Sequence, residues 1–435
     1  MKLRWISPLD PRETEIARYS AGLMPTLQGL VEVESVEDAR GGDAPDWWTP
    51  PAATAGESET AGEAPLPVYH IGNNPCHLPV HELACREPGL VVLHDLSLVD
   101  LARYLSHDAG RPELWKQLML RQYGDEVRGL VNRSEKSSAD YIEMIARFPL
   151  FLPFVQNALG VLVHSRYAFD ALRDQLAPAT PLLQLSLPFH AREEPAERNY
   201  QARPLRFVFC GHVGANRRLL EFFEAWGRLE NPGAIALELF GNIHNRGELQ
   251  QYAEHFGVAD FLRISGYVEE AQLEKALQSA HFAINLRWPT MGEASASQLR
   301  YWSAALPTLV TDVGWYGEVP DDTVCKISRQ HEIDDIAALL QDALLAPDKY
   351  SHIGQRGLEH LRASHRAQDY ARALASFAGE LVERRLAFRA IDQQLVSTIA
   401  SLCEDESNTV LFRGAIETSV ATFEPDTTKL EEDVL

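Results

Sequence analysis

The stretch Ile284-Asn-Leu-Arg-Trp-Pro-Thr-Met-Gly-Glu-Ala-Ser295, which continues to residue 318, decides the fold of this chain. Its apolar start predicts a strand over residues 283–286, and the pattern that follows predicts a helix over 297–305 and a second strand over 308–311. Glu293 and two serines stand at the start of that helix. A helix N-terminus carries unpaired N–H groups and a partial positive charge, which suit a phosphate. Strand, polar loop, helix and strand in this order are typical of an open α/β sheet, where ligands bind at the carboxyl ends of the strands.

Length and composition limit the classes of protein to which the chain can belong. Its 435 residues favour two or three domains, and 45% hydrophobic residues are enough for sizeable cores. The formal net charge of −22 argues against a nucleic-acid partner, which requires a basic surface. Five scattered cysteines, an odd number, argue against a disulfide framework and favour a reducing compartment.

The chain shows no targeting or membrane-spanning pattern. Residues 1–6 form a strand-like segment without a secretory apolar region, and no run of about 18 or more uncharged apolar residues occurs. We therefore expect a soluble cytoplasmic protein. Peripheral contact with the inner face of a membrane and the oligomeric state stay open.

The α/β pattern occurs twice, in two halves separated by a polar linker that contains prolines. A helix over 15–24 is expected to end at Pro25. The two halves predict an α/β fold with two Rossmann-like domains that face each other across a ligand-binding cleft. The expected boundaries are 1–188 for the first domain, 189–204 for the linker, 205–385 for the second domain, and 386–435 for a terminal helix with a loosely held tail.

Residues 39–65 are rich in Ala, Gly, Pro, Glu and Thr, and Trp47 and Trp48 are their only large apolar pair. This composition cannot bury enough surface to become ordered, so it predicts a mobile insertion. The tryptophan pair is either a lid or acceptor contact or a patch on a tethered loop.

A short segment of the first half carries possible metal ligands. His77, His81 and Cys85 recur every four residues, with Cys76 alongside. A zinc site requires all of them to turn toward one point, whereas ordinary helix faces produce the same spacing.

Glycines and polar residues follow the expected strands of both halves. Glycine lets the backbone approach a diphosphate closely, and Arg217 can donate a forked pair of hydrogen bonds to it. Alternatively, Arg217 and Arg218 belong to a solvated loop. The segments that follow strands in the second half are Gly211-His212, Arg217-Arg218, Gly241-Asn242, Gly266-Tyr267 and residues 291–297.

Because these strand-end segments occur in this order along the chain, most of residues 1–385 resembles a retaining nucleotide-sugar glycosyltransferase of the GT-B fold, specifically family 4. Pro289-Thr-Met-Gly-Glu293, followed by Pro307 and Asp312-Val-Gly314, resembles the glutamate motif of that family. His94 is similar to the strand-end histidine that contacts the sugar near the reacting carbon. The resemblance implies the donor-binding residues Gly211, His212, Arg217, Gly241, Gly266, Tyr267, Val268, Met291, Gly292, Ala294, Ser295, Ala296, Ser297 and Arg300. It implies the acceptor or cleft residues Gly72, Asn73, Asn74, Asp95 and Ser165.

The chain departs from the family pattern at three places. His212 stands where many relatives have an arginine. The second glutamate of the motif commonly holds the ribose, but position 301 is a tyrosine and, with a one-residue deletion, Arg300 takes that place. The glycine-rich loop after the first strand is absent, and Glu15 stands where a glycine is expected. Ribose recognition must therefore differ, and we interpret the chain as a subfamily variant.

The resemblance implies transfer of a sugar from a nucleotide sugar to a glycan, lipid-linked or similar hydroxyl acceptor, with His94 and Glu293 as catalytic residues. Glu293 would hold the sugar hydroxyls, or would merely be a carboxylate favoured by the helix dipole. His94 would orient the sugar or assist the acceptor, or would be a histidine satisfied within the fold. No metal or other cofactor is expected, because no Asp-X-Asp motif stands at a strand end. Two alternatives are a nucleotide-sugar epimerase of the same architecture and a catalytically degenerate scaffold subunit.

Overall fold

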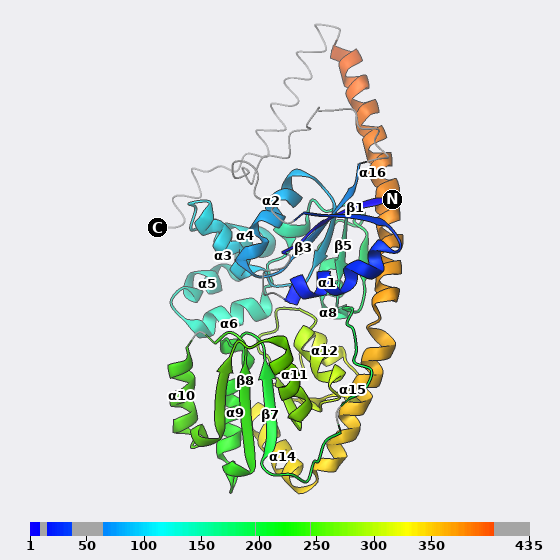
Figure 1. Cartoon of the computed structure of the whole chain (residues 1–435). Helices are drawn as coiled ribbons and strands as arrows, with labels where there is room; N and C mark the ends of the chain where they lie inside the picture. Colours follow the sequence, from blue (N-terminus) through cyan, green and yellow to red (C-terminus); the bar gives the residue numbers. More distant parts are fainter. Residues whose placement is uncertain (9–14, 37–63, 196, 244, 404–435) are drawn as a thin grey trace.

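The computed structural model describes residues 1–8, 15–36, 64–195, 197–243 and 245–403, and side chains in the last helix as far as residue 387. It contains two parallel six-stranded sheets in two lobes that are stacked end to end (Figure 1). The predictions for Trp47, Trp48 and the tail after residue 403 lie outside the described residues. Of the expected insertion, only Ala64 and Pro65 are described, and their carbonyls accept hydrogen bonds from Arg385 at 2.7 and 3.2 Å.

The first sheet has the order β2-β1-β3-β4-β5-β6, and all its neighbouring strands are parallel. Three of its four inner strands, β3, β4 and β5, are buried along their whole length, as expected when helices cover both faces of a parallel sheet. The strands are β1 (Lys2–Ile6), β2 (Glu32–Val36), β3 (Leu66–Ile71), β4 (Leu90–Leu93), β5 (Gly160–Val163) and β6 (Leu182–Gln184). The helices of this part of the chain are α1 (Glu15–Gln28), α2 (Leu78–Arg86), α3 (Val99–Asp108), α4 (Leu114–Tyr123), α5 (Asp125–Ser134), α6 (Ser138–Arg147), α7 (Leu152–Val155) and α8 (Arg166–Arg173).

The second sheet has the order β12-β11-β10-β7-β8-β9 and is also parallel throughout. One face packs on Phe222, Phe223 and Trp226 of helix α9. Its strands are β7 (Leu205–Cys210), β8 (Ile235–Phe240), β9 (Leu262–Gly266), β10 (Phe282–Asn285), β11 (Thr308–Thr311) and β12 (Cys325–Ile327). The helices are α9 (Leu219–Gly227), α10 (Arg246–His255), α11 (Glu270–Ser279), α12 (Ala296–Ser303), α13 (Gly314–Glu318), α14 (Glu332–Leu345) and α15 (Ser351–Ser364).

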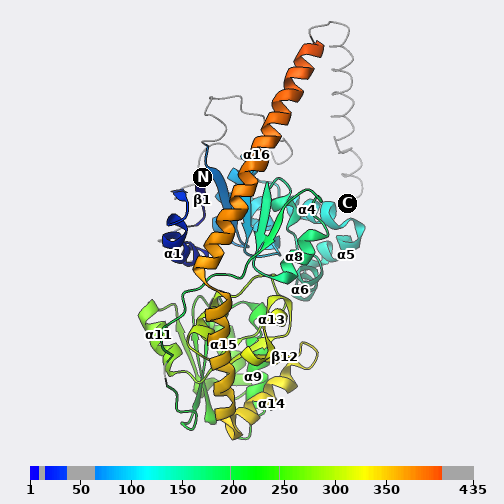
Figure 2. The ribbon, with the colours of Figure 1, turned by 90° about the vertical axis from the view of Figure 1, so that its right-hand side faces the viewer.

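The last helix, α16 (Ala367–Cys403), returns from the second lobe to the first (Figure 2). Its residues Tyr370, Leu374, Phe377 and Leu381 are buried in one hydrophobic cluster with Leu3, Trp5 and Leu27. Residues 367–385, which the sequence assigned to the second domain, therefore complete the apolar face of the first sheet and tie the lobes together.

The lobes also meet through hydrogen bonds made by the loop after β10 and by helix α13. The carbonyl of Met291 accepts hydrogen bonds from the N–H groups of Leu96 and Ser97 at 2.7 and 2.9 Å. The carboxylate of Glu318 in α13 accepts from the first N–H groups of α8, those of Arg166 and Tyr167. The loop that carries Glu293 is thus held against the first lobe.

Two details differ from the expectations. Helix α1 continues through Pro25 to Gln28, because Leu23 and Leu27 are buried in the core and their packing outweighs the hydrogen bond that proline removes. Strands β6 and β12 have only three residues each and were not expected, because so short a segment lacks a periodic pattern.

None of the described helices combines the length and the apolar character that crossing a membrane requires.

Candidate functional site

A cleft of about 1790 Å³ lies between the two lobes. Its walls are formed by α1 and the segments after β3 and β4 from the first lobe, and by the segments after β7, β8, β9 and β10 from the second. This convergence follows from the topology, since the carboxyl ends of parallel strands share one edge of each sheet. The residues expected in the site that line the cleft are Asn73, Asn74, His94, Asp95, Gly211, His212, Arg217, Gly241, Tyr267, Val268, Met291, Glu293, Ala294, Ser295, Ala296, Ser297 and Arg300.

Four residues expected in the site lie behind the lining, where they shape it. A side chain at Gly72 would meet Ile16 at 2.9 Å, and one at Gly266 would meet the guanidinium of Arg246 at 2.0 Å. Gly292 has φ +75° and lies against Leu96 of the first lobe, where a Cβ would be 2.4 Å from the Leu96 side chain. Ser165 is buried and caps α8 by accepting a hydrogen bond from Ala168 N at 3.0 Å.

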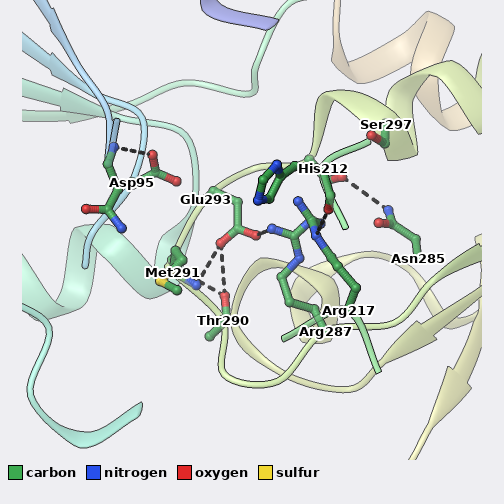
Figure 3. Close-up of polar contacts among 12 residues, drawn as sticks. Asp95, His212, Arg217, Asn285, Arg287, Thr290, Met291, Glu293 and Ser297 are labelled. Carbon is green, nitrogen blue, oxygen red and sulfur yellow. Dashed lines mark hydrogen bonds and ion pairs between the residues drawn. The ribbon is translucent and has the colours of Figure 1, made fainter. Parts of the chain in front are cut away.

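Glu293 is the centre of a buried polar group in the loop before α12 (Figure 3). One carboxylate oxygen pairs with Arg287, while the other accepts from Met291 N at 2.8 Å and from the Thr290 hydroxyl at 3.3 Å. Burial acts to lower the pKa of Arg287, but the charge of Glu293 together with Tyr316 and Asp95 outweighs it and raises that pKa, so Arg287 stays charged. The Arg287 guanidinium also lies 5.7 Å from the centre of the Tyr316 ring. The carboxylate therefore has a fixed orientation, with one lone pair of its Arg287-bound oxygen left for a ligand.

Arg217 and Arg218 have different surroundings. The Arg217 side chain lines the cleft, and its Nε donates to the carbonyl of His212 at 2.9 Å. Arg218 adopts left-handed backbone angles (φ 54°) and pairs with Glu332 at 2.7 Å and Glu221 at 2.6 Å. Arg217 is thus available to an anion in the cleft, whereas Arg218 holds α9 to α14.

The N-terminus of α12 opens into the cleft beside these groups. Ser295 caps it by accepting from Gln298 N at 3.2 Å, and Ser297 donates its hydroxyl to the carbonyl of Cys210 at 2.9 Å, which ties the helix to the end of β7. The N–H groups of Ala296 and Ser297 belong to the first turn, where no intrahelical acceptor exists. They lie in the lining with Arg217, so this corner can bind an anion.

His94 faces these groups from the first lobe and belongs to a cluster of histidine and tyrosine rings. Its Nε2 is 3.0 Å from Nδ1 of the fully buried His70, and the centre of the His164 ring lies 5.1 Å from that of His94, with the two rings tilted by 40°. Burial, with the neighbouring histidines, lowers the pKa of His94 well below its usual range. His94 is therefore neutral near pH 7, and His70 determines which tautomer it adopts.

The pKa of Asp95 lies far above the usual range of an aspartate. It accepts a hydrogen bond from Asn73 N at 2.7 Å. Burial, together with the charge of Glu293, raises its pKa to about 7. A carboxyl group with this pKa in a cleft can accept or donate a proton near neutral pH.

Arg300 joins a chain of charges across the cleft. It pairs with Glu270 of α11 and lies 3.7 Å from Glu15 of α1, and Arg18 of α1 approaches Glu15 at 2.9 Å and Glu270 at 3.5 Å. We call Glu15, Arg18, Glu270 and Arg300 the clasp, since it links α1 of the first lobe to α11 and α12 of the second.

Sequence reasoning missed several cleft residues. Arg287 follows an apolar strand directly, which was a usable signal, but its partnership with Glu293 depends on the course of the loop. Arg246 begins α10, and nothing in its local sequence places its guanidinium against Gly266. Asp100, Tyr104 and Tyr141 line the cleft from α3 and α6, in a segment where no site residue was expected.

The zinc alternative does not fit the geometry. Nδ1 of His77 is 2.8 Å from the carbonyl of His70, on the side of the cleft. His81 and Cys85 contact each other at 3.6 Å beside a separate small hollow. Among the described residues, no group of three or more His, Cys, Asp or Glu side chains could hold a metal ion.

No family model matches the chain, and no curated protein matches its sequence. Solved structures match over most of its length. Sucrose-phosphate synthase from Thermosynechococcus elongatus has a TM-score of 0.59 at 13% identity, covering 88% of this chain and 100% of that one. HepE of Anabaena, in complex with UDP and glucose, has a TM-score of 0.55 at 12% identity, covering 87% and 100%. WaaG, a glycosyltransferase involved in lipopolysaccharide biosynthesis, has a TM-score of 0.52 at 12% identity, covering 85% and 98%.

At these identities the likeness is one of fold. The chain has the GT-B fold of these glycosyltransferases, with two Rossmann-like domains, which confirms the fold class expected from the sequence.

Proposed function

We propose that this chain is a retaining glycosyltransferase of the family 4 type. It moves a sugar from a nucleoside diphosphate sugar to a hydroxyl group of a glycan or lipid-linked acceptor, in cell-surface polysaccharide synthesis. The observation that carries the proposal is the convergence of Arg217, the first turn of α12 and the Arg287–Glu293 pair on one cleft between the lobes. HepE with bound UDP and glucose has the same fold and supports a nucleotide-sugar donor.

The second lobe stabilises the leaving group in this mechanism. Negative charge grows on the diphosphate as the bond to the anomeric carbon breaks. Arg217 and the N–H groups of Ala296 and Ser297 are positioned before the reaction, so they lower the barrier without reorganising. These groups can carry the phosphate charge by themselves, and we therefore propose a reaction that needs no metal.

Glu293 and His94 act on the sugar. Glu293 accepts a hydrogen bond from a sugar hydroxyl through its remaining lone pair, and Arg287 holds it in that orientation. His94 is neutral and presents the ring nitrogen opposite His70 to the sugar, as a hydrogen-bonding group rather than a charge. Asp95 lies beside it with a pKa of about 7 and can take up the proton that the acceptor hydroxyl loses.

The four cysteines whose side chains are described are free thiols, which supports a reducing compartment. We therefore place the reaction in the cytoplasm, with an acceptor that is dissolved or presented at the inner face of a membrane.

Turnover of nucleotide sugars by Arg217→Ala and Glu293→Gln tests the proposal. Each variant should lose about a hundredfold or more in turnover, the effect of removing one positioned electrostatic group. Arg228→Ala is the matched control, since Arg228 lies on the same lobe outside the cleft and pairs with Glu224 and Asp334. Unchanged turnover in both test variants would refute the assignments. Product analysis with the donor alone separates transfer to water from epimerisation, and binding without any turnover would indicate a scaffold subunit.

A further inference from the structure

The cleft is larger than one substrate requires. Pockets for a single small ligand usually measure about 300–1,000 Å³, whereas this cleft measures about 1790 Å³. It therefore has room for a nucleotide sugar on the second lobe and a further ligand on the first.

The two walls of the cleft differ in charge. Among the residues that line it, the second lobe and the α15–α16 junction contribute six arginines and one acid, Glu293. The wall from the first lobe contributes three acids, Glu15, Asp95 and Asp100, and a single base, Arg18, which the clasp already pairs. The arginines are Arg217, Arg246, Arg287, Arg300, Arg362 and Arg366.

The wall of the first lobe contains a built polar site at the start of α3. The Asn73 side chain donates to Asp100 at 3.0 Å and accepts from Leu101 N at 2.9 Å. Tyr141 of α6 donates to the other oxygen of Asp100. These bonds fix the Asp100 carboxylate at the edge of the cleft, where hydroxyl or ammonium groups can donate to it.

Tyr104 stands one helical turn after Asp100 on the same face of α3. Its side chain is 50% exposed although it lines the cleft, and Ile142 and Ile145 of α6 line the same wall. An exposed phenol ring beside a fixed carboxylate suits a sugar, because the ring packs on the C–H face of a pyranose while the carboxylate receives its hydroxyl groups.

We propose that this wall, formed by Asn73, Asp100, Tyr104 and Tyr141, binds the acceptor and selects a neutral or amino sugar over a phosphorylated or carboxylated one. The inference rests on the proposed function and names the acceptor class for that site. The selection comes from charge: an anionic acceptor would meet the carboxylates of Asp100 and Asp95 in the lining of that wall. The one base in this lining, Arg18, is already paired, and Arg103 lies outside the lining over the rings of Trp115 and Tyr141. Like charges at close range in a partly dry site repel strongly.

Saturation-transfer NMR with paired glycosides tests this inference. The probes are the methyl glycosides of glucose, galactose, mannose and glucosamine, each compared with its 6-phosphate, and the glucose and galactose glycosides also with their uronic acids, all with saturating UDP. At least one neutral or amino glycoside should bind at least tenfold more tightly than its anionic partner. Tyr104→Ala should weaken that binding at least fivefold, while Asp108→Asn, an exposed acid at the end of the same helix, should leave it unchanged. Tyr104→Lys places a cation on the wall and should shift the preference toward the 6-phosphate at least tenfold.

Equal or tighter binding of the anionic partners, or no binding by any neutral or amino glycoside, would overturn the inference. Calorimetry with nucleoside diphosphates tests the proposed function separately. If none of them binds, the proposed function fails. If one of them binds but the protein prefers the anionic glycosides, only the acceptor class is refuted.

Discussion

Replacing Asp95 by asparagine should stabilise the protein while it impairs the reaction. Asparagine keeps the shape of the side chain and an oxygen that can accept from Asn73 N. It removes a carboxyl group whose pKa is raised from 3.8 to about 7 by burial and by Glu293. Each pKa unit corresponds to about 1.4 kcal/mol, so the ionised carboxylate costs the folded state up to about 4 kcal/mol.

The pH dependence follows from proton binding. Between about pH 4 and pH 7 the folded protein retains a proton on Asp95 that the unfolded chain has lost, so the contribution of Asp95 to stability falls as the pH rises through this window. Below pH 4 both states are protonated and the cost disappears. The gain from Asp95→Asn should therefore be about 1 kcal/mol at pH 4.5 and up to about 4 kcal/mol at pH 8.

Urea unfolding of the wild type and the variant at both pH values measures this difference. Asp108→Asn serves as the control on an exposed carboxylate and should change stability by less than about 0.5 kcal/mol at either pH. A gain that is equal at pH 4.5 and pH 8, or a loss at pH 8, would refute the raised pKa and the role of Asp95 as a proton acceptor. Turnover should fall in the same variant, because no carboxyl group is left to take the proton.

Two further predictions concern residues around the cleft. Arg300→Ala removes one of the two arginines of the clasp, whose partly exposed ion pairs contribute up to about 1 kcal/mol each, so the lobes should open about fivefold more often and small-angle scattering should report a larger radius of gyration. Half-molar NaCl should have the same effect on the wild type, and an unchanged radius in both cases would contradict the clasp. His70→Phe removes the partner of His94 and should lower kcat about tenfold without changing the KM of the donor, whereas His70→Asn, which keeps a polar atom near the position of Nδ1, should retain most of the activity. Equal losses in both variants would show that His70 only fills space.

Much of the fold could be predicted because buried parallel strands are nearly continuous apolar runs. The expected strand over residues 308–311 agrees with β11, and the expected strand over 283–286 lies within one residue of β10. Pro25 was misjudged because the packing of Leu27 is a tertiary effect that a local rule does not include. The return of α16 to the first sheet was not predicted, since nothing in its own sequence indicates which lobe it covers.

The candidate site was predictable as a set of strand ends, but its pairings were not. Topology alone brings Asp95, Arg217 and Glu293 to one cleft. The partners of Arg300 lie 30 and 285 residues away along the chain, at Glu270 and Glu15, so sequence reasoning placed Arg300 at the donor without its ion pairs.

Calorimetric titration with ADP, CDP, GDP, TDP and UDP tests most directly whether the second lobe grips a nucleoside diphosphate. At least one of them should bind with a micromolar Kd, and the corresponding nucleoside should bind at least a hundredfold more weakly. Arg217→Ala should weaken binding of the diphosphate at least tenfold, while Arg228→Ala should not change it. Failure of all five to bind, or equal affinity in wild type and Arg217→Ala, would show that Arg217 and the second lobe do not hold a nucleoside diphosphate.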